Sequence, residues 1–377
     1  MSQVLSFNEC VDLIKTVGKK RSIIVEGENG VGKTALHRAL AALPEFSGYV
    51  RPDPIDCTQL SDGSIWMPDI DKEKGISREL PNERLGVSRY NQRGIKDSKP
   101  VLLCFDEVLK VPQFIKNMIA PVLYERRVGD YYMEDGSITF GCTNMAIEGL
   151  GDIIQPHLRS RLCIVQMRKP TQEEWKNNFA IPNKLNAAVI ACTEMHPQMF
   201  DSFLDYEAGG KYDGKPQEKE NPYIFNPRIA QSGFASPRSL HAAADVVDCM
   251  EALTPMTLQA ALDGVIGAAA GALLASFVRF QQELTAYERV IADPEKAPLS
   301  DNPNAQLVQV FQFITRTEKR DDAAAVVKYV QRMRSEMQTM FCTNVANSTS
   351  SRLVVFANAP GFSKMLADNK VFFGGVR

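Results

Sequence analysis

Residues 27–34, with the sequence GENGVGKT, constrain the fold of this chain more than any other segment. They fit the phosphate-binding pattern G-x-x-x-x-G-K-[ST], in which glycines allow successive backbone amides to point at one phosphate. The apolar residues 22–25 before them predict a short buried strand, and residues 35–40 after them predict a helix. A strand, a glycine-rich loop and a helix N-terminus in this order predict a nucleotide site.

The residue types in this loop have separate tasks in holding a triphosphate. Lys33 is expected to reach the β- and γ-phosphates, and the Thr34 hydroxyl is expected to bind the Mg²⁺ that bridges them. The alternative is a glycine-rich turn that binds nothing, and the flanking strand and helix disfavour it. The candidate nucleotide-binding residues of the loop are Gly27, Asn29, Gly30, Val31, Gly32, Lys33 and Thr34.

A second apolar run, residues 101–105, is followed by two carboxylates, Asp106 and Glu107. It predicts a strand whose carboxyl end lies beside the phosphate loop. Asp106 is expected to be a metal ligand in the Mg²⁺ shell, and Glu107 is expected to polarise the attacking water as a general base. Residues 138–143 predict the next strand, after which Asn144 is placed to bind the γ-phosphate or that water. The alternatives are an acidic turn and a turn asparagine.

The composition is that of an ordinary globular protein. It is 44% hydrophobic and 23% charged, and its formal net charge of −2 gives no global attraction to nucleic acid or to an anionic membrane. Two local basic clusters, Lys19-Lys20-Arg21 and Arg126-Arg127, favour nucleic acid, but such clusters are usually solvated surface. Residues 264–278 are apolar but too short to span a membrane, so they predict a buried helix.

The cysteines, the histidines and the first residues bear on the compartment and on metals. Eight cysteines without a C-x-x-C pair predict reduced, mostly buried thiols in a cytosolic protein. Residues 1–10 lack the basic start and apolar core of a secretory signal, so a cytoplasmic location is expected. The four histidines have no zinc-like spacing, and we expect no metal beyond Mg²⁺ carried with nucleotide.

Apolar runs that alternate with helical patterns predict an α/β fold with a parallel sheet covered by helices on both faces. Residues 53–97 are rich in proline, glycine and charge and predict a long, partly mobile insertion, in which Trp66-Met67-Pro68 is a candidate apolar contact. Residues 208–222 predict an exposed loop, and residues 323–337 predict one amphipathic helix. The strand candidates are residues 22–25, 49–51, 101–105, 138–143 and 162–167.

The order of these features resembles the AAA+ ATPases over residues 20 to about 245. Residues 123–129 (LYERRVG) look like a segment of the MoxR-like branch, and residues 234–238 (FASPR) resemble the sensor 2 segment of that branch. The resemblance implies a P-loop NTPase core over residues 1–170, a helical lid over 171–245 and an additional C-terminal helical region over 246–377. That last region resembles the tail of small stand-alone ATPases of bacterial and phage genomes.

The same resemblance implies a ring of subunits, with a hexamer expected, in which each ATP lies between neighbours and Mg²⁺ is required. Arg161 is expected to be the arginine finger that one subunit supplies to the next, and Arg159 is its rival. Arg238 is expected to contact the γ-phosphate from the lid and to report the nucleotide state.

The leading function is a MoxR-like ATPase that couples ATP hydrolysis to the remodelling or maturation of a protein partner. In this family the partner often carries a von Willebrand A domain. A nucleic-acid motor or loader is the second reading, and salt-sensitive DNA binding would favour it. An ATP-gated assembly switch with slow hydrolysis is the third, and Glu107 argues against it.

Overall fold

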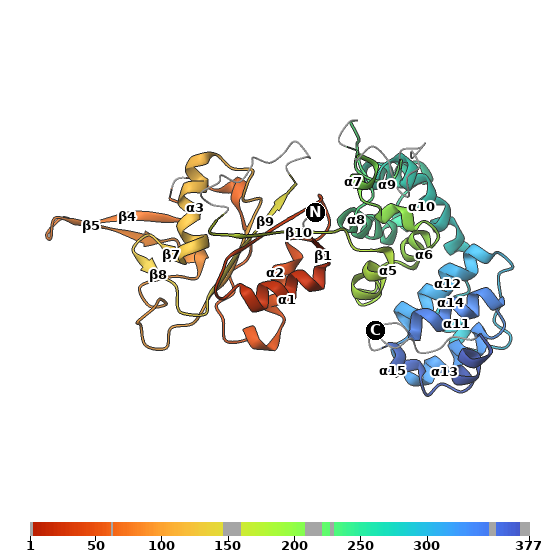
Figure 1. Cartoon of the computed structure of the whole chain (residues 1–377). Coiled ribbons are helices and arrows are strands. Elements are labelled where there is room, and N and C mark those ends of the chain that lie inside the picture. Colours follow the sequence, from red (N-terminus) through yellow and green to blue (C-terminus); the bar gives the residue numbers. More distant parts are fainter. Residues whose placement is uncertain are drawn as a thin grey trace. The chain divides into compact units, whose positions relative to one another are not determined.

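Figure 1 shows a computed structural model of the chain, which describes residues 3–61, 63–145, 160–207, 221–226, 230–346 and 352–369. It divides into two compact units, residues 1–169 and residues 170–377. Each unit is described by itself. The further division of the second unit into a lid and a C-terminal region stays a prediction.

The first unit is built on a six-stranded sheet in the order β1-β10-β2-β9-β6-β3. Every neighbouring pair in this sheet is parallel. The phosphate loop therefore follows a central strand, which has neighbours on both sides. The strands are β1 (Val4–Leu5), β2 (Ile23–Gly27), β3 (Ile55–Asp56), β6 (Leu102–Asp106), β9 (Ile138–Asn144) and β10 (Cys163–Met167).

Helices cover both faces of this sheet, as the sequence predicts. Alternate residues of one strand face opposite clusters: Leu102 and Cys104 of β6 join one buried cluster, and Leu103 joins the other. The first cluster includes α1 (Phe7–Val17) and α2 (Ala35–Ala41), and the second includes α3 (Gln113–Glu125). Strands that are buried on both faces have continuous apolar runs in their sequence, which is why β2, β6 and β9 could be predicted. The strand β10 is only partly buried, but its residues 163–165 are apolar.

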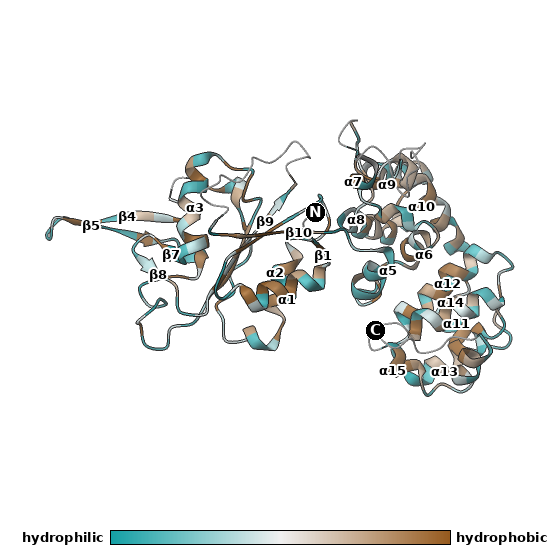
Figure 2. Ribbon diagram, viewed as in Figure 1, coloured by the Kyte–Doolittle hydropathy of each residue, from teal (hydrophilic) through white to brown (hydrophobic). Residues whose placement is uncertain are grey.

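Two details of the predicted sheet are wrong. Residues 49–51 form no strand, because only Val50 makes an isolated bridge, to Val101, and the edge strand β3 lies at Ile55–Asp56. The insertion contains an antiparallel hairpin, β4 (Trp66–Asp71) and β5 (Ile76–Pro81), which extends from the sheet in Figure 1. The hairpin was missed because both strands are largely exposed and polar, so alternation of apolar residues is weak there; its tip is hydrophilic in Figure 2.

A second hairpin, β7 (Arg127–Val128) and β8 (Tyr131–Tyr132), packs against the first. A Cβ at Gly129, whose φ is +55°, would lie 2.5 Å from the carbonyl oxygen of Glu79, so a larger residue is excluded at this turn. The backbone amide of Glu79 donates to Asp130 Oδ2 at 2.9 Å. The two hairpins are thus one connected structure.

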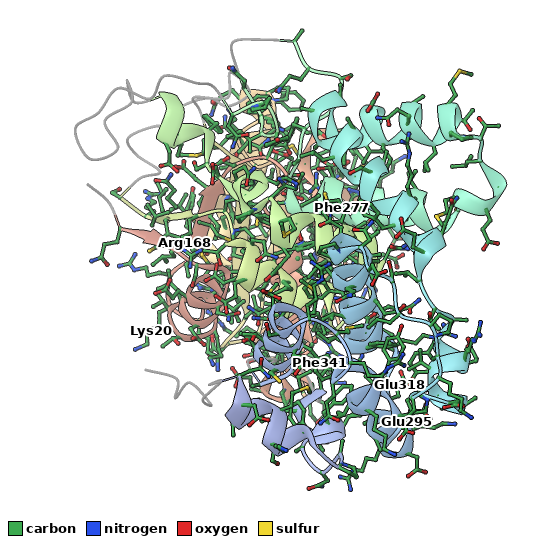
Figure 3. The ribbon with its side chains drawn as sticks, turned by 90° about the vertical axis from the view of Figure 1, so that its right-hand side faces the viewer. Lys20, Arg168, Phe277, Glu295, Glu318 and Phe341 are labelled. Carbon is green, nitrogen blue, oxygen red and sulfur yellow. The ribbon has the colours of Figure 1, made fainter. Side chains whose placement is uncertain are left out.

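The second unit is helical, and one apolar cluster runs through it from Trp175 to Leu366. The helix α12 (Pro303–Arg316) is buried almost all round, which makes it the central helix of this unit. Phe277 and Phe341, labelled in Figure 3, are buried in the same cluster. The other helices are α5 (Gln172–Trp175), α6 (Ala187–Met195), α7 (Phe203–Glu207), α8 (Pro237–Asp248), α9 (Pro255–Ile266), α10 (Ala268–Phe280), α11 (Tyr287–Ala292), α13 (Arg320–Val330), α14 (Ser335–Ala346), α15 (Arg352–Phe356) and α16 (Phe362–Asp368).

Two predicted helices of this unit are each broken into two. The apolar residues 264–278 belong to α9 and α10, which are separated at Gly267, where φ is +83°. A Cβ at Gly267 would lie 2.5 Å from the carbonyl oxygen of Gly233, so close backbone approach requires glycine there. Residues 323–337 are divided between α13 and α14 by a turn at residues 331–334.

No helix of the described residues is long and apolar enough to cross a membrane. The predicted loop at residues 208–222 lies mostly outside the described part of the chain, which resumes at residue 221.

Candidate functional site

The phosphate loop connects β2 to α2 and has the backbone that its glycines predict. Gly30 and Gly32 have φ values of +74° and +101°, a region that residues with a Cβ rarely adopt. A Cβ at Gly32 would meet nothing within 4 Å, so backbone conformation and not space requires glycine there. At Gly27 the reason differs, because a Cβ would lie 2.9 Å from the carbonyl oxygen of Met167 on β10.

Lys33 lies inside this loop and is only 6% exposed. Its Nζ donates to the carbonyl oxygens of Gly27 at 2.8 Å and Glu28 at 2.7 Å, and to Asn144 Oδ1 at 2.8 Å. Strand pairing explains the last contact, because Gly27 at the end of β2 is in register with Asn144 at the end of β9. The structure thus brings together the two residues that the sequence left more than a hundred positions apart.

The Thr34 hydroxyl and the Asp106 carboxylate are also in contact. Thr34 Oγ1 donates to Asp106 Oδ2 at 2.5 Å. A hydroxyl beside a carboxylate at the carboxyl edge of the sheet is a donor set that suits Mg²⁺, which prefers oxygen ligands. The two residues that the sequence predicts to bind Mg²⁺ are therefore in direct contact.

Glu107 follows Asp106 with a left-handed backbone, at φ +55°. Such a conformation is costly for a non-glycine residue and is common at functional sites. Its Oε1 forms an ion pair with Lys110 Nζ at 2.8 Å, and its backbone amide donates to Asp106 Oδ1 at 3.0 Å. Lys110, which holds this carboxylate, was not singled out from the sequence, although its place three residues after Glu107 is the available signal.

Three buried polar atoms at this edge have no hydrogen-bond partner among the described residues. They are Glu107 Oε2, Asn144 Nδ2 and Thr143 Oγ1. Leaving a buried polar atom unpaired costs about 1–3 kcal/mol, so each calls for an explanation. With the buried Lys33 ammonium and the Thr34-Asp106 pair, they fit a Mg²⁺-bound triphosphate, which would supply both acceptors and donors.

Asp56 adds a third carboxylate that the sequence analysis missed. It ends β3 and is in register with Asp106 on β6. The Thr58 hydroxyl and backbone amide donate to Asp56 Oδ1, and the hydroxyl bond is the main reason why the pKa of this carboxyl lies below its usual range. It was missed because the edge strand was expected at residues 49–51. The Asp-x-Thr spacing, typical of a side-chain capped turn, was the usable signal.

Buried thiols pack beneath the loop. Cys142 Sγ lies 3.5 Å from the carbonyl oxygen of Lys33 and 4.0 Å from Cys104 Sγ. Burial raises the pKa of the Cys104 thiol well above its ordinary value, so it stays protonated and packs as a small apolar group. All eight cysteines are free, and Cys249 alone is exposed.

Arg161 lies at the opposite edge of the sheet from the phosphate loop. It comes two residues before β10, whose first residue Cys163 is in register with Ile23, the first residue of β2. At about 3.3 Å per strand residue, Arg161 is roughly 20 Å from the level of Gly27, too far to reach phosphates in its own site. Its guanidinium lies 4.8 Å from the ring centroid of Tyr124. Arg159 lies outside the described residues.

Arg238 is an exposed residue in the first turn of α8, in the second unit. The predicted start of this helix is confirmed, because Ser236 is its N-cap and Pro237 its first residue. The Ser236 hydroxyl accepts from the Ser239 amide at 3.1 Å. Contact between Arg238 and a nucleotide stays a prediction.

The two basic clusters singled out from the sequence differ in the structure. Arg126 is half-buried and donates to the carbonyl oxygens of Ser137 at 2.8 Å and Gly18 at 2.7 Å. Arg127 donates to Glu125 and to Gly129. These two arginines therefore stabilise the fold, while all three residues of the cluster at 19–21 are exposed.

Comparisons with known proteins give only a loose structural likeness. No protein-family model matches the chain, and no curated protein sequence matches it. Among solved structures it is similar to a RuvB variant from Thermotoga maritima, at 13% identity and TM-score 0.34, covering 77% of this chain and 75% of that one. It is also similar to NtrX from Brucella abortus in complex with ADP, at 13% identity and TM-score 0.36, covering 97% and 68% of the two chains. For Hsp104 with ADP from S. cerevisiae the identity is 12%, the TM-score 0.30 and the coverage 98% and 48%.

The strand order and the loop geometry carry the fold assignment without help from these likenesses. The first unit is an α/β P-loop NTPase fold, with the phosphate loop after a central parallel strand and the paired acids two strands away. The second unit is the helical region that follows it.

Proposed function

We propose that this chain is a Mg²⁺-dependent ATP hydrolase of the AAA+ type. One observation carries the proposal: Lys33, Thr34, Asp106, Glu107 and Asn144 meet at one edge of the sheet, although they come from three separate segments. This set contains a cation for phosphates, oxygen ligands for Mg²⁺ and a carboxylate for the attacking water. A turn with only a structural role has no need of this combination.

Each residue has one task in the proposed reaction. Lys33 would bind the β- and γ-phosphates, and Thr34 and Asp106 would hold Mg²⁺, whose charge would offset that of the transferring phosphoryl group. Glu107 accepts the proton of the attacking water through Oε2, the carboxylate oxygen that has no partner among the described residues. Asn144 Nδ2 donates to the γ-phosphate or to the same water.

A neighbouring copy completes the site in this proposal. Arg161 is too far from its own phosphate loop, so as an arginine finger it serves the next copy, with Arg159 as the alternative. Sites shared in this way close into a ring when the rotation between copies closes, and a hexamer is the expected form. Arg238 acts from the lid.

The finer assignment is a MoxR-like ATPase of the cytoplasm that remodels or matures a protein partner. A partner with a von Willebrand A domain is the specific expectation, and an ATP-gated assembly switch is the alternative in which hydrolysis is incidental. The mass of the Glu107→Gln protein by light scattering, with and without ATP and Mg²⁺, tests the assembly. A nucleotide-dependent ring supports the shared site, and a monomer under all conditions contradicts it.

Two substitutions test the ATP site itself. Lys33→Ala should weaken ATP binding, measured by titration with a fluorescent nucleotide, and Glu107→Gln should keep binding but lower turnover by about 10²- to 10⁴-fold. Glu73→Gln, at the exposed turn of the β4–β5 hairpin, is the matched control and should keep both properties. Undiminished ATP binding by Lys33→Ala would contradict the phosphate-loop assignment. Unchanged turnover by Glu107→Gln would show that Glu107 is not the general base.

A further inference from the structure

Residues 86–99 form an ordered surface loop that the proposed ATPase does not use. Asn91 holds the loop together, since its Nδ2 donates to the carbonyl oxygen of Gly86 at 2.7 Å and its Oδ1 accepts from the Lys99 amide at 2.7 Å. The Arg93 amide donates to the carbonyl oxygen of Tyr132 on β8 at 3.0 Å, which fixes the loop to the second hairpin. We call the surface formed by this loop and Tyr132 the Tyr90 surface.

The Tyr90 surface is strongly basic in a chain whose net charge is slightly negative. Residues 86–99 contain four arginines and lysines and a single carboxylate, Asp97. Arg93 forms an exposed ion pair with Asp135 at 2.7 Å. Arg89, Lys96 and Lys99 are exposed and form no ion pair with any described residue, so these cations are available to an anion.

Two exposed aromatic rings lie within the same surface, each with an arginine over it. Tyr90 is 77% exposed, and the guanidinium carbon of Arg89 lies 5.7 Å from its ring centroid. Tyr132 is 45% exposed, with the guanidinium carbon of Arg93 5.8 Å from its ring centroid. An exposed tyrosine of this kind contributes little to the fold, because most of its area stays in water.

From this arrangement we infer that the Tyr90 surface binds single-stranded nucleic acid. The arginines and lysines pair with phosphates, and unpaired bases stack on Tyr90 and Tyr132. An acidic peptide would use the cations but gains little from flat exposed rings, and a duplex keeps its bases inside. The inference does not depend on ATP hydrolysis, because no residue of the phosphate loop takes part.

The position of the surface supports an extended ligand. The loop leads into β6, so it lies at the amino edge of the sheet, the edge from which Lys19, Lys20 and Arg21 lead into β2. The order β2-β9-β6 puts the amino ends of the two strands into which these basic segments lead about 10 Å apart along the edge. A strand of nucleotides bound at Tyr90 can therefore continue towards the second basic segment.

The test is fluorescence anisotropy of a labelled oligothymidine of about 16 nucleotides with the full chain, without ATP, over a series of salt concentrations. Tyr90→Ala should weaken binding about tenfold, and Tyr90→Phe, which keeps the ring, should bind like the wild type. Lys96→Gln should lower the steepness of the salt dependence by about 0.7 for the phosphate contact it loses. Lys328→Gln, at an exposed position of α13 in the second unit, is the control.

Failure of this inference and failure of the ATP site are distinguishable. Lys33→Ala should keep oligothymidine binding even where it loses ATP. The inference is overturned if the wild type shows no salt-dependent binding, if Tyr90→Ala binds like Tyr90→Phe, or if a duplex of equal length or an acidic peptide competes better than the single strand.

Discussion

The two edges of the parallel sheet hold their polar side chains under opposite conditions. At the carboxyl edge, Lys33 and Asn144 are buried and joined by a hydrogen bond. At the amino edge, Lys20 and Arg161 are exposed. Buried groups held in one geometry suit a small ligand that the protein surrounds, while exposed cations suit a larger anionic surface. Our two proposals accordingly assign a small ligand to the carboxyl edge and a larger anionic partner to the amino edge.

Arg161→Ala should have the largest effect, although it lies at the edge far from the phosphate loop. Turnover at saturating ATP should fall about 10³-fold, because charge on the transferring phosphoryl group loses its finger. Nucleotide binding should remain. Arg21→Ala, at the start of the neighbouring strand, is the control and should retain turnover. Normal turnover by Arg161→Ala would show that Arg161 is not the arginine finger, and the role would then belong to Arg159 or to no arginine of this segment.

Lys110→Met tests whether the carboxyl edge depends on a fixed Glu107. Without the 2.8 Å ion pair, the Glu107 carboxylate loses its orientation, and kcat should fall about tenfold with unchanged ATP affinity. Lys110→Arg keeps the charge and should recover most of the rate. A rise in kcat would show the reverse, that Lys110 holds the carboxylate away from the water.

Arg126→Met and Arg127→Met compare two half-buried arginines that have different partners: Arg126 donates to two backbone carbonyl oxygens, and Arg127 donates to the Glu125 carboxylate and to the carbonyl oxygen of Gly129. The loss of two charged hydrogen bonds to backbone carbonyl oxygens should lower the free energy of unfolding by about 1–3 kcal/mol for Arg126→Met. Arg127→Met should lower it by about 1 kcal/mol or less, as for surface ion pairs. Chemical unfolding measures both, and equal effects would contradict the different roles.

His37 on α2 should add a small pH dependence to the stability of the first unit. Burial lowers its pKa below the ordinary value of 6.5, so the unfolded chain takes up the proton first as pH falls. The free energy of unfolding should therefore decrease from about pH 6.5 downward to the folded pKa. His37→Gln should show a smaller decrease than the wild type, with His241→Gln at an exposed position as control. An identical pH dependence in His37→Gln excludes the effect.

The phosphate loop and the central strands could be predicted because their signals are local. Glycines at positions 30 and 32 and an apolar run before Asp106 require no knowledge of the rest of the chain. The rule that parallel strands end at one edge also predicted that Asn144 lies at the edge of the phosphate loop, and the structure adds its hydrogen bond with Lys33. The strands that the sequence did not predict depend on tertiary context. The edge strand β3 has only two residues, and the strands of the β4–β5 hairpin are too exposed to show an alternation of apolar and polar residues.

The helix breaks and the Tyr90 surface also lay beyond the sequence. Gly267 ends α9 because the backbone at Gly233 approaches it closely, a contact between segments far apart in the chain. Arg89, Tyr90 and Arg93 belong to a segment rich in turn-forming residues. That this segment shares a surface with Tyr132 is visible only in the structure, where Arg93 contacts Tyr132.

The most direct test of a site completed across two copies is to mix Arg161→Ala subunits with Glu107→Gln subunits, each inactive alone. The Arg161→Ala subunit keeps its phosphate loop and Glu107, and the Glu107→Gln subunit keeps Arg161. In a mixed ring, the two subunits together therefore form complete sites. With a shared site, turnover should return in the mixture and reach its maximum when both proteins are present in similar amounts. Mixed assemblies that form, shown by retention of one subunit through a tag on the other, yet hydrolyse no ATP would contradict it.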